Sequence, residues 1–215
     1  MSGRVLSVNV SSVRSVEMRG KSVTTGIYKI PVAGRVPLRG VNLRGDDQAD
    51  RNAHGGPDRA VYAYASEDYR WWEASLERTL DAGMFGENLT LAGVDVSGAL
   101  IGERWRAGGT LLQVTAPRVP CFKLAHVMGD PAFVKRFAQA LRPGAYLSVV
   151  EEGEIASGDA VEITVKPRHV LTVAEMTHIY FNDRSRLAEL LVPELPEEWQ
   201  TWVEEQMAKR GGPQS

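Results

Sequence analysis

The stretch TLLQVTAPRVPCFKL, residues 110–124, organises the middle of this chain. Its first five residues are apolar enough to predict a short strand over residues 110–114. Pro117 and Pro120 fix their own φ angles and push the residues before them towards extended backbone. The stretch therefore predicts a strand followed by a stiff, non-helical segment that leads to Cys121, the only cysteine of the protein.

Cys121 has a cation on each side of it in the sequence, Arg118 and Lys123. A cation close to a thiol favours the thiolate, which is the form that attacks electrophiles or binds soft metals. Cys121 is therefore a candidate nucleophile or metal ligand. The alternative is a thiol that only packs, because free cysteine is among the most buried residue types. The stretch by itself leaves both interpretations open.

Short apolar runs on both sides of this stretch predict many short strands with two inserted helices. The first helix follows Ser66, an expected N-cap, and carries Tyr69, Trp72, Leu76 and Leu80 at helical spacing. The second is expected to start at Asp130. The predicted strands cover residues 5–10, 23–32, 60–65, 89–91, 98–109, 110–114, 145–150 and 160–165. This pattern indicates the α+β class, as an irregular closed β-barrel with inserted helices.

The character of the sequence changes after Pro167, where three short helical patterns cover residues 172–180, 184–191 and 196–209. We therefore expect a barrel domain over residues 1–166 and a small three-helix domain over residues 167–210. Residues 211–215 are expected to form a disordered tail.

Composition narrows the class of protein. The formal net charge is −2, which argues against general binding to nucleic acid or to anionic membranes. No apolar run is long enough to cross a bilayer, and the N-terminus lacks the apolar core of a signal peptide. One cysteine suits a reducing compartment, so we expect a cytoplasmic protein.

A long polar passage, residues 39–59, ends in the motif HGGPDR. Gly55 and Gly56 allow the backbone to approach a ligand closely. His54 offers an acid–base group, Asp58 an acceptor, and Arg59 a guanidinium fork that suits a phosphate. The motif therefore favours an anion site, although Asp58 and Arg59 would equally serve to tie down a tight turn.

The motif FGEN, residues 85–88, offers Asn88, whose amide would either cap a turn or read the edge of a heterocyclic ring. Glu87 would orient a cation such as Arg118, or be exposed. The four histidines are too scattered for a zinc site, and no phosphate-binding or dinucleotide-binding loop is present. Together these signals describe an anion-binding cleft with a thiolate at one end. A cysteine hydrolase with His126 or His54 as its base remains an alternative.

Four motifs carry a resemblance to a known family. HGGPDRAV (54–61), FGENL (85–89), IGERW (101–105) and PRVPCFKL (117–124) occur in the order seen in MOSC domains, which are named for the C-terminal domain of molybdenum cofactor sulfurases. The chain resembles the stand-alone bacterial branch, in which the barrel is followed by a small three-helix domain. The resemblance spans roughly the whole chain.

The resemblance implies that this protein binds the molybdenum cofactor, Mo-molybdopterin. In the family, the cysteine that matches Cys121 is the protein ligand of molybdenum, together with two dithiolene sulfurs from the pterin. A thiolate is a soft donor of the kind that such a metal needs. The candidates for holding the pterin and its phosphate are Gly55, Gly56, Arg59, Asn88, Arg118 and Lys123.

Stand-alone bacterial members are linked to resistance to N-hydroxylated bases such as 6-hydroxylaminopurine. The resemblance therefore implies a detoxifying oxidoreductase that reduces N–OH to N–H, with His54 or Asp58 relaying a proton. Electrons would come from a separate reductase, for which residues 46–51 are a candidate contact, and a homodimer is compatible with the sequence. The alternative is a non-catalytic cofactor carrier, or a sulfur-transfer module that uses Cys121.

Two positions depart from the family pattern. Glu103 stands where relatives often carry Asp, and Ala116 stands where a polar residue often precedes the Pro-Arg pair. The role of Glu103 is therefore open, and a contact to pterin or substrate would be missing at Ala116.

Overall fold

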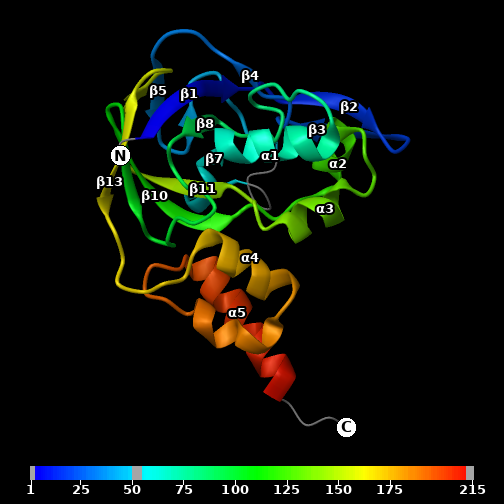
Figure 1. The fold of residues 1–215 in the computed structure, drawn as a ribbon, viewed down its shortest axis with the longest axis vertical. Coiled ribbons are helices and arrows are strands. Elements are labelled where there is room, and N and C mark those ends of the chain that lie inside the picture. The colour runs from blue at the N-terminus through cyan, green and yellow to red at the C-terminus, as the bar shows by residue number, and fades with distance from the viewer. Residues whose placement is uncertain (1–2, 50–54, 212–215) are drawn as a thin grey trace.

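The computed structural model describes residues 3–49 and 55–211 of the chain. Its main body is a closed barrel in which the strands follow the order β13-β9-β10-β11-β7-β8-β1, and β1 pairs with β13 to close the ring. All neighbours in the ring are antiparallel except β7 and β8, which are parallel. The barrel strands are β1 (Gly3–Val10), β7 (Val61–Ala65), β8 (Leu89–Ala92), β9 (Arg104–Ala107), β10 (Thr110–Pro117), β11 (Ala145–Glu151) and β13 (Ala160–Val165). The predicted α+β barrel is confirmed (Figure 1).

Smaller strands surround one end of the barrel. A hairpin joins β2 (Arg14–Met18) to β3 (Lys21–Thr25), and β4 (Ile30–Pro31) pairs with β1. A separate sheet has the order β12-β5-β6, with β12 (Gly153–Ile155), β5 (Val36–Arg39) and β6 (Asn42–Leu43). The polar passage predicted over residues 39–59 therefore contains a short strand, and it ends in a 3-10 helix, η1 (Pro57–Arg59).

The single strand predicted over residues 23–32 is wrong, because β3 and β4 are separated by four residues without regular structure, 26–29. Gly26 explains the break. A Cβ atom at Gly26 would lie 2.5 Å from the carbonyl oxygen of Asp47, so only glycine permits this close approach of the two segments. This crossing shapes the mouth of the cleft described below.

Strand β7 is buried on both faces, which explains its continuous apolar sequence. Val61, Ala63 and Ala65 belong to the apolar interior of the barrel. Tyr62 and Tyr64 point the other way, into a second cluster that three helices cover. These helices are α1 (Ser66–Leu76), α2 (Phe122–Met128) and α3 (Phe133–Ala140), and Figure 1 shows them on one flank of the barrel.

The second cluster is largely aromatic. The ring of Tyr64 stacks on Phe85 with centroids 4.3 Å apart, and Trp72 donates its Nε1–H to the Tyr64 hydroxyl at 2.8 Å. Trp72 and Phe137 are fully buried in the same layer. The aromatic residues of α1 are therefore core, and they anchor the loop that carries Phe85 beside the cleft.

Three details of the helices differ from expectation. Ser66 is the first helical residue rather than the N-cap, which is Ala65, and Leu80 lies beyond the end of α1. Helix α3 starts after Ala132, whose N–H bonds to the Asp130 carboxylate at 2.8 Å. Helix α2 was not predicted, because two prolines precede it and its seven residues are too short for a periodic signal.

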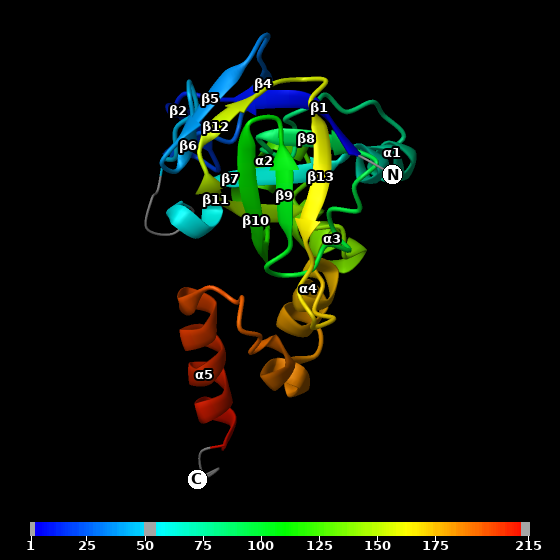
Figure 2. The same cartoon turned by 90° about the vertical axis from the view of Figure 1, so that its left-hand side faces the viewer.

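The C-terminal segment folds as α4 (Val173–Phe181), a kinked 3-10 helix η2 (Arg184–Leu190) and α5 (Glu197–Gly211). Thr172 caps α4 by accepting a hydrogen bond from the Glu175 N–H. Figure 2 shows these helices as a layer at one end of the barrel. Their buried residues, such as Met176 and Val203, belong to the same apolar cluster as the barrel interior. The domain boundaries stay predictions, and residues 212–215 lie outside the described residues.

None of the helices in the described ranges is both long and apolar enough to cross a membrane.

Candidate functional site

Cys121 stands at the N-cap of α2 in extended backbone, and its side chain is half-buried. Strand β10 ends at Pro117, and residues 118–120 have no regular structure, as the two prolines predict. This short connection places Cys121 on the wall between two clefts. The first cleft is polar and opens among the loops at the barrel end. The second is aromatic and lies between the barrel and the C-terminal helices.

The polar cleft has a volume of about 120 Å³ and is open to solvent at its mouth. Cations, amides and two carboxylates are among the groups that line it. They come from the segment 25–29, the loop 46–49, η1, β7, the FGEN turn, the connection 118–121, α2 and β11. The polar lining side chains are Thr25, Lys29, Asp46, Asp47, Gln48, Arg59, Tyr62, Asn88, Arg118, Cys121, Lys123 and Tyr146.

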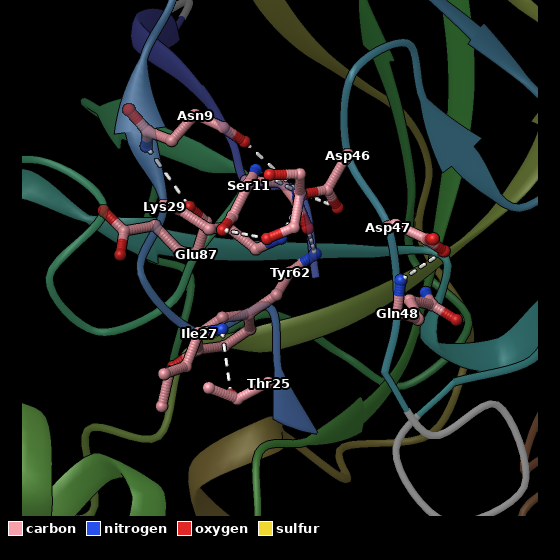
Figure 3. A network of polar contacts seen from close by, with 12 residues as sticks. Asn9, Ser11, Thr25, Ile27, Lys29, Asp46, Asp47, Gln48, Tyr62 and Glu87 are labelled. Carbon is pink, nitrogen blue, oxygen red and sulfur yellow. Dashed lines mark hydrogen bonds and ion pairs between the residues drawn. The ribbon is translucent and has the colours of Figure 1, made fainter. Parts of the chain in front are cut away.

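A buried ion pair forms the floor of this cleft (Figure 3). The Asp46 carboxylate accepts hydrogen bonds from Lys29 Nζ at 2.5 Å, from the Ser11 N–H at 2.8 Å and from Asn88 Nδ2 at 2.9 Å. Burial lowers the pKa of Lys29, while Asp46 acts against that shift. The Asp46 side chain is only 2% exposed, so this residue presents no surface charge, and the contact of residues 46–51 with a reductase stays a prediction.

Asn88 uses both ends of its amide inside the protein. Its Oδ1 accepts the Tyr62 N–H at 3.1 Å, and its Nδ2 donates to the carbonyl oxygen of Asn9 at 3.2 Å as well as to Asp46. Asn88 lines the cleft, but these bonds join β1, β7 and the loop that carries Asp46. We therefore assign Asn88 a positioning role. Both ends of its amide already bond within the protein, so the expectation that the amide reads the edge of a ring is not supported.

Arg118 places a guanidinium group beside the thiol. The residue is 6% exposed, its Nη1 donates to the carbonyl oxygen of Phe85, and the guanidinium lies 5.2 Å from the Tyr62 ring centroid. Arg118 is close enough to Cys121 for their charges to interact. Lys123, in the first turn of α2, also lines the cleft. The two cations that flank Cys121 in the sequence therefore share one cleft with it.

Glu87 does not orient Arg118 and is not exposed, so both expectations for this residue are wrong. It is fully buried, and its Oε1 accepts hydrogen bonds from the Tyr69 hydroxyl, the Gly83 N–H and the Thr90 hydroxyl, each at 2.7 Å. Burial raises the pKa of this carboxyl group, although the three hydrogen bonds act against the shift. Glu87 thus holds the turn that carries Asn88.

The second cleft has aromatic walls. One wall comes from the end of β10 and from β11, and the other comes from α4 and α5. Its lining residues are Arg59, Pro117, Val119, Pro120, Cys121, Tyr146, Tyr180, Glu198, Trp199 and Trp202. Arg59, Val119, Cys121 and Tyr146 line both clefts. Tyr146 is half-buried on β11, and desolvation raises the pKa of its hydroxyl while Arg118 and Arg59 act against that shift.

The structure thus gathers five of the predicted site residues, which are Arg59, Asn88, Arg118, Cys121 and Lys123. It does not place Gly55, Gly56 or Asp58 on the lining of either cleft. Asp58 is partly buried in η1, and this burial raises the pKa of its carboxyl group. His54 lies outside the described residues.

The two departures from the motif pattern have structural explanations. Glu103 is buried, and its Oε1 accepts the Trp105 indole N–H at 2.7 Å, so it serves the barrel core. Ala116 is buried in β10 and its side chain belongs to the barrel interior, away from both clefts. Neither position therefore contacts a ligand in the clefts.

Sequence reasoning missed Lys29, Asp46, Gln48 and Tyr146 as site residues. No motif marks them, because each lies far along the chain from Cys121 and reaches the cleft only through the barrel topology. The one usable signal was the loop itself, since long polar loops inside compact domains are often functional.

Comparisons with known proteins agree with this geometry. Residues 50–162 match the MOSC domain family. The chain is 38% identical over 183 residues to the uncharacterized protein YflK of Bacillus subtilis, covering 85% of this chain and 83% of YflK. The chain belongs to the MOSC domain family. MOSC domains are associated in general with binding of the molybdenum cofactor, so membership supports a role related to that cofactor.

Two further MOSC relatives bear on structure and activity. The crystal structure of YiiM from Geobacillus stearothermophilus superposes with a TM-score of 0.79 at 31% identity, covering 95% of this chain and 99% of that one. A protein of Gibberella moniliformis named a reductase is 32% identical over 169 residues, which are 77% of this chain. This chain spans only 30% of that fungal protein.

The donor set of the cleft fits a metal that arrives with its own ligands. Among the described residues, no group of three His, Cys, Asp or Glu side chains could hold a metal ion. Cys121 therefore offers a single thiol, which is what a dithiolene-bound molybdenum leaves for the protein to supply. Gln48 lines the cleft, and its buried Oε1 has no hydrogen-bond partner among the described residues. An orphaned acceptor of this kind suits the N–H groups of a pterin.

Proposed function

We propose that this MOSC protein is a molybdenum-cofactor-dependent reductase that converts N-hydroxylated bases, or related N-hydroxylated compounds, to amines. The observation that carries the proposal is the position of Cys121, the only thiol of the chain, on the wall shared by a cationic cleft and an aromatic cleft. A cofactor with a phosphate fits the cationic side. The substrate then approaches the same thiol from the other side.

The residues of the polar cleft would bind different parts of the cofactor, according to their chemistry. Cys121 supplies the thiolate ligand. Arg118, Lys123 and Arg59 offset the negative charge of the pterin dithiolene and phosphate, and arginine suits phosphate because its donors form a planar fork. Lys29 and Asp46 neutralise each other, so their pair fixes the shape of the floor rather than adding charge. The cofactor supplies the two-electron redox chemistry when it is bound.

Reduction of an N–OH group breaks the N–O bond, consumes an electron pair and a pair of protons, and releases water. The Tyr146 hydroxyl is the group we assign to hold a proton for this step, because it lies where the two clefts meet. Burial raises the pKa of Tyr146, so the hydroxyl stays protonated at neutral pH and donates to the departing oxygen. His54 and Asp58 remain sequence predictions for the same role.

The electrons come from a separate reductase in this proposal, as the sequence predicts. The fungal homologue named a reductase supports an oxidoreductase activity, and this chain covers 30% of it.

The runner-up function is a cofactor carrier or a sulfur-transfer module, and it uses the same cationic cleft. The aromatic cleft favours the reductase over the carrier, because a carrier has no need for a second site beside the thiol. A cysteine hydrolase finds less support. His126 is exposed on α2 and lines neither cleft, so among the described residues no histidine stands beside the thiol as a base.

Metal content is the decisive test. The full chain, made in a host with abundant cofactor, should contain near-stoichiometric molybdenum and release pterin on denaturation, whereas Cys121→Ser should contain little metal. The loaded wild type should then reduce 6-hydroxylaminopurine with an artificial electron donor. Metal and pterin without turnover would favour the carrier. Absence of both from the wild type would rule out the redox proposal, and Cys121 would then be tested with thiol-reactive substrates.

A further inference from the structure

We infer that the β2–β3 hairpin is the docking surface for the electron donor, and that the donor is a protein with acidic side chains around its redox group. The inference rests on the proposed function, because it names the kind of partner that serves the same site and the face on which that partner binds. The donor supplies the electron pair that cleavage of the N–O bond consumes.

The hairpin stands apart from the barrel sheet. Strands β2 and β3 form a sheet of their own, and Figure 1 shows this hairpin projecting beyond the barrel on the side where α2 lies. The register pairs Arg14 with Thr25 and Met18 with Lys21, so these four side chains share one face. Met18 is buried and Thr25 lines the polar cleft, so this face is turned towards the protein. Arg14 and Lys21, at the two ends of the face, are exposed.

The hairpin carries a local excess of positive charge. Its cations Arg14, Arg19 and Lys21 are all exposed. Within residues 3–49 and 55–211, none of the three forms an ion pair with a carboxylate. Glu17, the acid of the hairpin, pairs with Ser22 in the register and therefore lies on the opposite face from Arg14 and Lys21. A surface of this sign attracts acidic proteins.

Two of these cations are held in place beside the cofactor cleft. At the tip of the hairpin, Arg19 Cζ lies 5.5 Å from the centroid of the Phe122 ring. Phe122 directly follows Cys121 and is the first residue of α2. At the other end, Arg14 Cζ lies 4.2 Å from the centroid of the Tyr28 ring. Cation–π contact keeps the charge and positions the guanidinium group. A donor docked on these cations is therefore next to the segment that carries the thiol.

The size and charge of this surface favour an electron-transfer protein over other anionic partners. Encounters between redox proteins use small interfaces and are steered by charge. Anionic membranes are recognised by clusters of about four to eight cations. The hairpin offers fewer, and the chain as a whole has a net charge of −2, which is unlike a nucleic-acid-binding protein. We therefore expect a flavin or iron–sulfur protein whose redox group is surrounded by Asp and Glu.

The first experiment measures binding of the full chain to two acidic electron carriers, a flavodoxin and a plant-type ferredoxin, by calorimetry at low and at high salt. The wild type should bind at low salt, and the affinity should fall as salt rises. Arg14→Gln, Arg19→Gln and Lys21→Gln together, the hairpin variant, should weaken binding by about tenfold and remove most of the salt dependence. Arg14→Lys with Arg19→Lys keeps the charges and should bind nearly as well as the wild type.

A matched control removes the same charge from another face. Arg4, Lys166 and Arg168 are exposed cations at the start of β1 and just after β13. Figure 1 shows the N-terminus and β13 on the opposite side of the barrel from the hairpin. Arg4→Gln, Lys166→Gln and Arg168→Gln together should therefore leave carrier binding unchanged. A loss as large as that of the hairpin variant would overturn the inference, because net charge rather than the hairpin would then attract the carriers.

A second experiment separates docking from the proposed function. Reduction of 6-hydroxylaminopurine by the loaded enzyme is measured with each carrier and with reduced methyl viologen, a small donor that needs no docking surface. The hairpin variant should be about tenfold slower than the wild type with a carrier at low salt, and equal to it with methyl viologen.

The outcomes are distinct. Binding to neither carrier, or equal rates of wild type and hairpin variant with the carriers, overturns the inference even if methyl viologen supports turnover. Binding to anionic vesicles or duplex DNA through the hairpin, in place of the carriers, also overturns it. Carrier binding that depends on the hairpin, in a protein that reduces no N-hydroxylated compound, supports the docking surface and refutes the reductase.

Discussion

Arg59 Nη2 lies 2.9 Å from Glu198 Oε2, and this ion pair joins η1, at the end of the polar loop, to the first turn of α5. The two side chains differ in exposure, with Arg59 at 14% and Glu198 at 63%. The pair therefore couples the C-terminal helices to the residues that surround the thiol. Because Glu198 is largely in water, the pair contributes to position more than to stability.

Glu198→Gln should lower the free energy of unfolding by at most about 1 kcal/mol, which is the usual size of an exposed ion pair. The loss should shrink at high salt, because salt screens exposed charges. Urea unfolding at low and at high salt measures both effects. Glu204→Gln is the control, since Glu204 is an exposed residue of the same helix. A loss of several kcal/mol would mean that the pair is far better shielded than its exposure indicates.

Asp46→Ala should destabilise the protein by about 3–5 kcal/mol, because the change leaves the buried Lys29 ammonium without its partner. It also removes the acceptor of the Ser11 N–H and of Asn88 Nδ2. Lys29→Met added to Asp46→Ala should recover part of the loss, since the double variant buries no charge. Chemical denaturation of both variants gives the two free energies. If the double variant is less stable than Asp46→Ala, the unpaired lysine is not the cause.

Glu87 predicts a pH dependence of stability whose sign follows from burial. Its pKa is raised in the folded protein, so the folded state holds its proton to higher pH than the unfolded state does. As pH rises through the interval between the ordinary and the raised pKa, the free energy of unfolding should fall by up to about 1.4 kcal/mol per pH unit. Glu87→Gln cannot titrate and should lack this fall. The free energy of unfolding of Glu87→Gln, measured relative to the wild type at the same pH, should therefore increase from pH 4 to pH 7.

Urea unfolding of wild type and Glu87→Gln at several pH values tests that difference. The comparison within each pH cancels the titration of the other carboxyl groups, and Glu204→Gln reports the effect of removing an exposed acid. A stability difference that does not change with pH would show that the three hydrogen bonds to Glu87 cancel the effect of its burial on the pKa.

Local sequence patterns predicted the closed barrel and the C-terminal helices because both depend on apolar periodicity. β7 is an example, since its run of apolar residues already indicated burial on both faces. Helix starts were less predictable. Ser66 has the side chain of an N-cap, yet it is the first residue of α1. The helix follows the buried strand directly, so the last strand residue, Ala65, occupies the N-cap position.

Residues of the candidate site could be predicted from the sequence only where a reactive side chain and its partners are neighbours along the chain. Arg118 and Lys123 flank Cys121 in the sequence and share its cleft in the structure. Lys29 and Tyr146 could not be found in this way, because the fold brings them to the cleft of Cys121 from distant parts of the chain, the segment 26–29 and β11. Asn88 lines the cleft, but its buried hydrogen bonds depend on Asn9 and Asp46, which no local pattern connects to it.

Tyr146→Phe should separate proton transfer from cofactor binding. The variant keeps the half-buried ring and loses only the hydroxyl at the meeting point of the two clefts, so molybdenum content should equal that of the wild type. Turnover of 6-hydroxylaminopurine should fall by about 100-fold, which is a usual contribution of a general acid. The wild type should lose activity only at alkaline pH, as the hydroxyl deprotonates, and the variant should lack that limb. Tyr180→Phe, which changes the aromatic cleft alone, should keep the wild-type pH profile. Full activity in Tyr146→Phe would assign the proton to another donor, with Asp58 and His54 the next residues to replace.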